Sequence, residues 1–388
     1  MKVMLVIPHL SDGGAEKVLS ELSLDLGLGE LVLVVFQEKV GYPFKGRLIS
    51  LDIPIQQQSI FGRAFGFIRR SYRFRRILQQ EHPDVVVSFM GEANFINALL
   101  SPQPILTVHN HLSSTSKLRG KTEAFAFNVL LRLLYRRATV VAVSEAVKRD
   151  LVENFGLHAN RIVVITNAVN IHEIQRLSAE DVTCPWNPSL PVVITAGRLH
   201  PQKGQWHLLR AFAEVRRKME CQLAILGTGD LEDYLRRLAA EAGIDKDVYF
   251  LGWQKNPFKF MAKADLFVLS SVTEGFPLVL MEAMACRLPV IATDCPGSSK
   301  EIIAPGGEEY GILVPAAGDK MCNGLEPCTG EELELAGAIL RMLRDTKLRQ
   351  RYIEAGLVRI RDFDRATFVE KYRRLICSSV PQSTKTAL

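Results

Sequence analysis

The sequence lacks any apolar run long enough to span a membrane. Its longest runs, such as 31–36 and 278–281, fall far short of the roughly 20 residues that a spanning helix needs, which excludes a transmembrane protein. The run at 3–7 is also too short for a secretory signal, so we expect a cytoplasmic protein. The seven cysteines are odd in number and form no CxxC pair, which favours reduced thiols over a disulfide framework.

The sequence also lacks the common loops that bind nucleotide cofactors. A glycine pair, Gly13-Gly14, follows the first apolar run, where backbone N–H groups at the start of a helix can bind an anion. It forms neither GxGxxG with a suitably placed acid nor GxxxxGK[ST], so we expect no nicotinamide cofactor and no P-loop. Two DxD triplets, 245–247 and 362–364, lie away from the expected strand ends, and we expect no metal.

Short and almost continuously apolar runs alternate with helical stretches along the whole chain. Such runs are typical of strands buried on both faces of a parallel sheet. They lie at 3–7, 31–36, 84–89, 105–108, 139–143 and 162–165, and then at 192–196, 222–226, 248–251, 266–269, 289–292 and 312–314. The restart after a Pro-rich stretch at 184–191 predicts two doubly wound α/β domains in tandem.

We place the domain boundary between residues 180 and 181, and the second domain ends near 364. Residues 365–377 are predicted to form a last helix, and 378–388 a flexible tail. Ligands of open parallel sheets bind beyond the carboxyl ends of the strands. The deep cleft between two such domains is therefore the expected site.

The positive charge is concentrated in the first domain. The net charge is +6, and residues 1–180 hold 21 Lys and Arg against 16 Asp and Glu. Within 61–80 there are six arginines and no acid. On a helix, Phe61, Phe65, Ile68 and Tyr72 form one apolar stripe and Phe67, Phe74 and Leu78 another, and five arginines lie between the stripes: Arg63, Arg69, Arg70, Arg73 and Arg76.

One apolar stripe of this segment must pack on its domain, which leaves the other available. It could enter a lipid interface while the arginines meet anionic head groups. The alternatives are a helix with a solvated basic edge and a nucleic-acid patch, although no RNA- or DNA-binding motif supports the latter. We therefore expect contact with a membrane surface and no nucleic-acid partner.

Two loops of the second domain carry polar residues directly after predicted strands. Gly197, Arg198 and Lys203 follow the strand at 192–196, and the two cations are suited to clamp a diphosphate. After the strand at 266–269, Glu274 precedes a helix start at Gly275, Phe276, Pro277 and Leu278. Glu282 lies inside this apolar helix, where a glutamate needs a polar partner. The two carboxylates fit sugar and ribose hydroxyls, and the N–H groups of 275–278 fit phosphate or hexose.

In the first domain, His109 follows the predicted strand at 105–108. Its position predicts that it points into the same cleft from the opposite domain. A histidine at a strand end can equally be structural.

Taken together, these motifs resemble those of the family-4 retaining glycosyltransferases. The matching residues are Gly13-Gly14, His109, Asn167-Ala168-Val169, Gly197-Arg198-Leu199 with Lys203-Gly204, Gly227-Thr228-Gly229 and, most specifically, the Glu-x7-Glu pair Glu274 and Glu282. The resemblance implies the GT-B fold, in which two Rossmann-like domains face each other across a deep cleft. It also implies that the first domain binds the acceptor, that the second binds the nucleotide sugar, and that the last helix crosses back to the first.

The resemblance also implies roles for these residues. Arg198 and Lys203 would neutralise the departing diphosphate, Glu282 would hold the ribose, and Glu274 would contact the donor sugar. His109 would reach the sugar and its β-phosphate, Gly14 would contact phosphate through its backbone, and the base would lie beside Trp253. Transfer would retain the anomeric configuration without a protein nucleophile, cofactor or metal.

Further motifs favour one subgroup of this family. Asp294-Cys295-Pro296, the segment 310–315 and the opening Gly-Gly-Ala-Glu resemble enzymes that extend oligosaccharides on undecaprenyl diphosphate from UDP-N-acetylhexosamines. We therefore expect a UDP-sugar donor, a lipid-linked acceptor, and a location on the cytoplasmic face of the inner membrane. The alternatives are a lipopolysaccharide-core glycosyltransferase, a sugar-nucleotide epimerase of the same fold, and a non-catalytic adaptor at the membrane.

Overall fold

The computed structural model describes residues 1–11, 13–55, 60–117, 121–324 and 326–380. The chain divides into two compact units, one formed by Met1–Ala168 with Arg365–Leu388 and the other by Val169–Asp364. The units therefore meet at 168/169 rather than at the expected 180/181. The difference arises because helix α7 (Ile171–Ser178) packs against α10 (Phe258–Met261) and α11 (Leu278–Ala285) of the second unit.

The first unit is built on a seven-stranded sheet in the order β3-β2-β1-β4-β5-β6-β7. Its strands are β1 (Lys2–Ile7), β2 (Glu30–Val35), β3 (Arg47–Ser50), β4 (Val85–Phe89), β5 (Pro104–Val108), β6 (Thr139–Ala142) and β7 (Ile162–Val164). All neighbouring strands are parallel. The central strands β1, β4 and β5 are buried along nearly their whole length, as their apolar sequences require.

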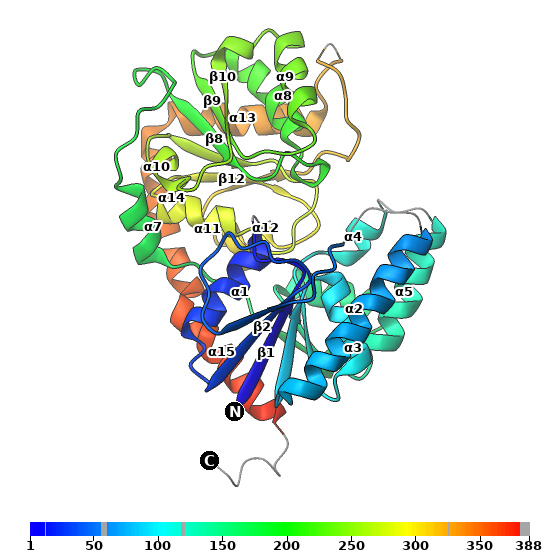
Figure 1. The fold of residues 1–388 in the computed structure, drawn as a ribbon. Helices are drawn as coiled ribbons and strands as arrows, with labels where there is room; N and C mark the ends of the chain where they lie inside the picture. The colour runs from blue at the N-terminus through cyan, green and yellow to red at the C-terminus, as the bar shows by residue number, and fades with distance from the viewer. Residues whose placement is uncertain (12, 56–59, 118–120, 325, 381–388) are drawn as a thin grey trace. The chain divides into compact units, whose positions relative to one another are not determined.

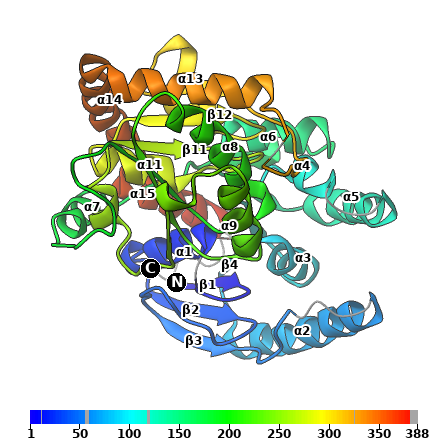
Figure 2. The same cartoon turned by 90° about the horizontal axis from the view of Figure 1, so that it is seen from above.

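Helices cover both faces of this sheet. They are α1 (Gly14–Asp25), α2 (Ile60–Glu81), α3 (Gly91–Leu100), α4 (Leu112–Lys117), α5 (Lys121–Tyr135), α6 (Glu145–Glu153) and the short η1 (Ala159–Arg161), together with the last helix of the chain, α15 (Arg365–Ser379). Helix α3 contacts both α2 and α5, as Figures 1 and 2 show.

Helix α15 belongs to the first unit although it follows the second in sequence. Arg365 forms ion pairs with Glu21 (2.6 Å) and Asp25 (2.8 Å) of α1, and Arg373 donates to the carbonyl of Leu26 just beyond α1. Positions 378–379 are the last residues of α15, and most of the predicted tail, 381–388, lies outside the described residues.

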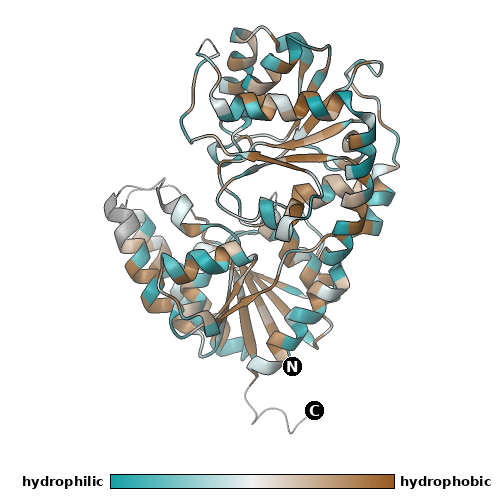
Figure 3. Cartoon of the chain, turned by 180° about the vertical axis from the view of Figure 1, so that it is seen from behind, coloured by the Kyte–Doolittle hydropathy of each residue, from teal (hydrophilic) through white to brown (hydrophobic). Residues whose placement is uncertain are grey.

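The second unit has a six-stranded parallel sheet in the order β10-β9-β8-β11-β12-β13. Its strands are β8 (Val192–Ala196), β9 (Gln222–Leu226), β10 (Val248–Gly252), β11 (Leu266–Leu269), β12 (Val290–Asp294) and β13 (Ile312–Pro315). Beyond α7, α10 and α11, its helices are α8 (Gln205–Arg216), α9 (Glu232–Glu241), α12 (Ser299–Ile303), α13 (Gly330–Arg344) and α14 (Thr346–Arg359), with short turns η2 (Pro201–Lys203), η3 (Asp245–Asp247), η4 (Pro305–Gly307) and η5 (Ile360–Phe363). Figure 3 shows the hydrophobic strands of both sheets.

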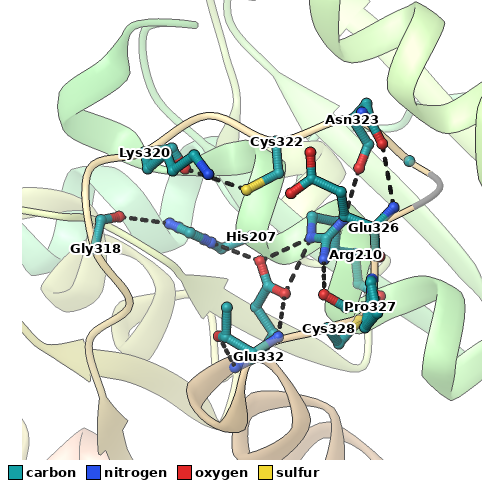
Figure 4. Close-up of polar contacts among 12 residues, drawn as sticks. His207, Arg210, Gly318, Lys320, Cys322, Asn323, Glu326, Pro327, Cys328 and Glu332 are labelled. Carbon is teal, nitrogen blue, oxygen red and sulfur yellow. Dashed lines mark hydrogen bonds and ion pairs between the residues drawn. The ribbon is translucent and has the colours of Figure 1, made fainter.

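A buried ionic cluster ties the 318–330 loop to α8 (Figure 4). Arg210 donates to both carboxylate oxygens of Glu332 (2.9 and 3.0 Å), and its other nitrogens donate to the carbonyls of Asn323, Glu326 and Pro327. His207 lies between Glu332 and the carbonyl of Gly318, at 2.8 Å from each. Because α8 directly follows η2, this cluster holds the helix that carries the Arg198–Lys203 loop.

Candidate active site

An ion pair joins two of the predicted residues at the carboxyl edge of the second sheet. Lys203, in η2 after β8, donates to Oε1 of Glu274, in the loop after β11, at 2.6 Å. Ser271 donates to the same oxygen at 2.5 Å. The Glu274 side chain is 6% exposed and that of Lys203 19%, so the pair is largely shielded from water and each charge needs the other.

Backbone contacts between the two loops create this pair. The N–H of Val272 donates to the carbonyl of Gln202 at 2.9 Å, and the Gln202 amide donates to the carbonyl of Thr273 at 3.0 Å. Gly204 lies at the crossing with φ +56°, where a Cβ would stand 2.4 Å from the carbonyl oxygen of Ser270. Only glycine permits this approach without displacement of the backbone.

Arg198 and Glu282 occupy contrasting environments. Arg198 is exposed, and its guanidinium has no hydrogen-bond or ion-pair partner within the described chain. Glu282 is 9% exposed and lies in α11, as the sequence predicted, with buried apolar residues around it. Pro277 caps α11 instead of forming its first turn, and the helix begins at Leu278. The leading N–H groups of α11 have no partner within the helix.

The remaining predicted residues of the second unit lie in neighbouring loops. Gly197 follows β8 directly, and its N–H donates to the carbonyl of Leu226 at the end of β9. Gly227 donates in turn to the carbonyl of Gly252 at the end of β10. Trp253 follows directly and is 59% exposed. The strand ends of β10, β9, β8 and β11 thus carry residues 253, 197–203 and 274 along one edge of the sheet.

In the first unit, His109 follows β5 as predicted. Its ring stacks on Phe89 (centroids 5.6 Å apart, planes at 28°), and Nε2 lies 3.0 Å from the Thr107 hydroxyl. Nδ1 is buried and has no hydrogen-bond partner among the described residues. Burial lowers the pKa of His109 to about 4, so the imidazole is neutral near pH 7.

At Gly13-Gly14 the structure differs from the simple expectation of an open anion site. Helix α1 begins at Gly14, but the Glu16 carboxylate turns back toward Gly13, where a Cβ would stand 2.0 Å from its Oε2. Glu16 is 4% exposed and also lies 3.6 Å from His9. An acid thus fills the space beside the N-terminus of α1, and a phosphate here would require Glu16 to move.

The five arginines of α2 do not form one surface. Arg70 is 3% exposed and donates to Glu92 (2.5 Å) and to the carbonyl of Pro54 (2.8 Å), while Arg73 donates to the carbonyl of Leu51. These two residues therefore hold the 51–54 segment in place, and the expectation that they face a membrane or acceptor is wrong for Arg70. Arg63, Arg69 and Arg76 are exposed.

The apolar stripes of α2 separate as the sequence predicted. Phe74 is fully buried, and Phe67 and Leu78 pack against the same core. The opposite stripe is open to solvent: Phe65 is 62%, Ile68 63% and Tyr72 63% exposed. Phe61 belongs to this stripe in sequence, but its side chain is outside the described part of the chain.

Neither a pocket nor a metal-binding cluster coincides with the predicted residues in the described part of the chain. A pocket of about 280 Å³ lies between the C-terminal ends of α5 and α6 and the start of β7, and it contains none of them. Within the residues that the structure describes, no group of three His, Cys, Asp or Glu side chains could hold a metal ion. No helix in that part of the chain is both long and apolar enough to cross a membrane.

Comparison with known proteins decides the family. Residues 13–173 match the model "Glycosyltransferase Family 4", and 190–345 match "Glycosyl transferases group 1". An uncharacterized glycosyltransferase of Methanocaldococcus jannaschii is 31% identical over 80% of this chain and 84% of its own length. The chain belongs to the family-4 glycosyltransferases.

Two other similarities extend along nearly the whole chain of this glycosyltransferase. An N-acetylgalactosamine-N,N'-diacetylbacillosaminyl-diphospho-undecaprenol 4-alpha-N-acetylgalactosaminyltransferase of Campylobacter jejuni is 28% identical over 94% of this chain and 96% of its own. The HepE protein of Anabaena, solved in complex with UDP, superposes with a TM-score of 0.74 at 21% identity and covers 97% of this chain and 100% of its own. The second similarity confirms the predicted GT-B fold of two Rossmann-like domains.

Proposed function

We propose that this glycosyltransferase moves a hexose or N-acetylhexosamine, with retention of configuration, from a UDP-sugar to a lipid-linked saccharide at a membrane surface. The observation that carries the proposal is the arrangement of Arg198, Lys203 and Glu274 at one edge of the second sheet. This arrangement supports the proposal, because two cations and a carboxylate suit the diphosphate and the hydroxyl groups of a nucleoside diphosphate sugar.

The charges of this edge suit a donor whose leaving group becomes an anion. Within the described chain the Arg198 guanidinium has no partner, so binding an anion would break no existing contact there. Lys203 has further N–H donors beyond the one that binds Glu274. Oε1 of Glu274 already accepts from Lys203 and Ser271, which leaves Oε2 for a sugar hydroxyl. The HepE structure with UDP supports a uridine nucleotide.

The proposed chemistry breaks the bond between C1 of the sugar and the diphosphate oxygen. An acceptor hydroxyl forms the new bond to C1 on the same face, and its proton passes to the departing diphosphate. Positive charge develops on the sugar ring and negative charge on the diphosphate in the transition state. Fixed cations that meet this negative charge lower the barrier, because they stabilise the transition state more than the ground state.

The acceptor is proposed from two independent observations. The Campylobacter relative, which aligns along 94% of this chain, is named for a diphospho-undecaprenol substrate. The open face of α2 presents Phe65, Ile68 and Tyr72 beside Arg69 and Arg76, which all lie within about 100° of arc on the helix. An aromatic and cationic face of this kind suits the interface of an anionic membrane, where a lipid-linked acceptor would be found.

Vesicle binding tests the membrane part of the proposal. We expect the protein to sediment with anionic phosphatidylglycerol vesicles and not with phosphatidylcholine vesicles. The double variant Arg69→Glu with Arg76→Glu should abolish this binding, whereas Arg149→Glu, which changes another exposed arginine of the same unit, should retain it. Equal binding by both variants would contradict a role for α2.

Calorimetric titration with UDP, GDP and ADP tests the donor part. We expect UDP to bind best and Glu282→Gln, which keeps the volume of the buried side chain, to weaken it roughly 10–100-fold through loss of a charged hydrogen bond. A protein that binds none of the three nucleotides would be an adaptor and not the proposed enzyme. Conversion of a UDP-sugar into its epimer without an acceptor would favour an epimerase. Transfer to lipopolysaccharide core alone would show that the acceptor is not the proposed lipid-linked saccharide.

A further inference from the structure

The hydrogen bonds around His109 determine which of its ring nitrogens carries the proton. Thr107 lies two residues before His109 on β5, and its hydroxyl has two contacts: the carbonyl oxygen of Ser88 at 2.9 Å and Nε2 of His109 at 3.0 Å. A carbonyl oxygen can only accept. A hydroxyl has one proton to donate and can accept another.

Both contacts are hydrogen bonds in only one arrangement of the protons. Thr107 donates its proton to Ser88, and His109 donates from Nε2–H to the Thr107 oxygen. If Thr107 donated to His109 instead, the contact with Ser88 would be lost, and the proton on Nδ1 would be a buried donor without acceptor. Such donors are rarer in proteins than unpaired acceptors.

The surroundings of Thr107 hold it in the position that this arrangement requires. The Asn94 amide donates to the carbonyl of Thr107 at 2.8 Å, and Asn94 itself accepts from the Ser88 hydroxyl at 2.8 Å. Thr107, Ser88 and Asn94 are all buried. The stacking of His109 on Phe89 fixes the plane of the ring.

We infer that Thr107 is a positioning residue that fixes His109 as the neutral tautomer with its proton on Nε2. Nδ1 then presents a bare lone pair, which the described residues leave without a partner. Its complement is a hydrogen-bond donor, such as a sugar hydroxyl or an acetamido N–H of the substrate, and the atoms that cover Nδ1 in the free protein must move before such a donor reaches it. A phosphate oxygen, which is itself an acceptor, is excluded from this position. The assignment of this donor to the sugar rests on the proposed function, whereas the tautomer does not.

The tautomer can be measured directly by NMR of ¹⁵N-histidine-labelled protein. The His109 signals are identified by their absence from the spectrum of His109→Gln. We expect Nε2 to give the signal of a protonated ring nitrogen and Nδ1 that of an unprotonated one near neutral pH. Thr107→Ser should keep this pattern, because it keeps the hydroxyl, and Thr107→Val should lose it.

Kinetics with the UDP-sugar then separate a positioning role from a purely structural one. We expect Thr107→Val to lower kcat/KM about tenfold, the effect of one hydrogen bond, while Thr107→Ser restores it. Thr139→Val makes the same change in the neighbouring strand β6, at a half-buried position, and should leave kcat/KM unchanged. Thermal unfolding of the three variants reports whether they fold.

The outcomes separate this inference from the proposed function. A wild-type spectrum with the proton on Nδ1, or a Thr107→Val spectrum with the wild-type pattern, overturns the positioning role whatever the enzyme transfers. Failure of every UDP-sugar to react would overturn the proposed function, and the spectra would still decide the tautomer.

Discussion

Arg198→Ala and Lys203→Ala should have similar effects on turnover and different effects on stability. Both residues are proposed to stabilise the departing diphosphate, but within the part of the chain that the structure describes only the Lys203 side chain has a partner. Lys203→Ala leaves the Glu274 carboxylate, 6% exposed, with Ser271 alone. Arg198→Ala removes an exposed side chain that the described structure leaves unpaired.

The contacts of the two side chains set the expected difference in the free energy of unfolding between the two variants. Loss of a charged hydrogen bond to a buried carboxylate costs about 1–3 kcal/mol, which lowers the unfolding temperature of a unit of this size by roughly 2–4 °C for each kcal/mol. Substitution of an unpaired surface residue changes the free energy of unfolding by about 0.5 kcal/mol at most. Each substitution should lower turnover on the order of 10²–10³-fold, the effect of a lost electrostatic contact in the transition state.

Two assays on the same preparations check this prediction. Calorimetric unfolding gives the stability of each variant, and steady-state turnover of the UDP-sugar gives the rate. Glu274→Gln is a useful third variant, because it removes the charge that Lys203 neutralises and should moderate the loss of stability when combined with Lys203→Ala. Near-native turnover of a folded Lys203→Ala protein would refute the assignment, and equal stability of Lys203→Ala and wild type would refute the account of the ion pair.

Three further predictions concern stability. The pKa of His109 is about 4 in the folded protein and 6.5 in the unfolded chain. The free energy of unfolding should therefore fall by roughly 1.4 kcal/mol per pH unit as the pH falls from 6.5 to 4. Urea titrations of His109→Gln should not show this fall. In the buried ionic cluster of Arg210, His207 and Glu332, hydrogen bonds from His207 and Arg210 outweigh burial and lower the pKa of Glu332. The stability that this shift contributes is present above the ordinary glutamate range and is lost as the pH falls through the folded pKa. Arg210→Met removes the cation of a buried ion pair and leaves the Glu332 carboxylate to His207, so it should cost about 3–5 kcal/mol at neutral pH, measured by chemical unfolding. Gly204→Ala should destabilise more than Gly243→Ala in the same assay, because both have positive φ but only Gly204 faces a backbone oxygen within 2.4 Å.

The sequence predicts most of the fold because the strands are nearly continuous in apolar residues. The one strand that it misses, β3 (Arg47–Ser50), is a four-residue edge strand with no buried residue, so it lacks the apolar run that identifies the others. The domain boundary is displaced by about one helix for a similar reason. The sequence of α7 does not indicate which unit the helix packs against through Ile174, its single buried residue.

The sequence predicts which residues belong to the candidate site, but it does not predict which of them contact each other. The spacing from Glu274 to Glu282 follows from one loop and one helix, which local sequence determines. The pairing of Glu274 with Lys203 joins positions 71 apart in sequence, and it depends on β8 and β11 being neighbours in the sheet. Arg70 was misassigned for the same reason, since its acceptors, Glu92 and the carbonyl of Pro54, lie 22 and 16 positions away.

The pair of Lys203 and Glu274 also bears on how the proposed donor would bind. In the free protein each charge neutralises the other, so among the described residues Arg198, and not Lys203, is the unopposed cation of the two. A diphosphate that takes a hydrogen bond from Lys203 need not break the pair, because an ammonium has three donors. The Lys203 charge would then be shared between Glu274 and the diphosphate in the ground state. Growth of negative charge on the departing diphosphate shifts that balance toward the leaving group, so a larger part of the Lys203 interaction would be realised in the transition state, where it accelerates the reaction.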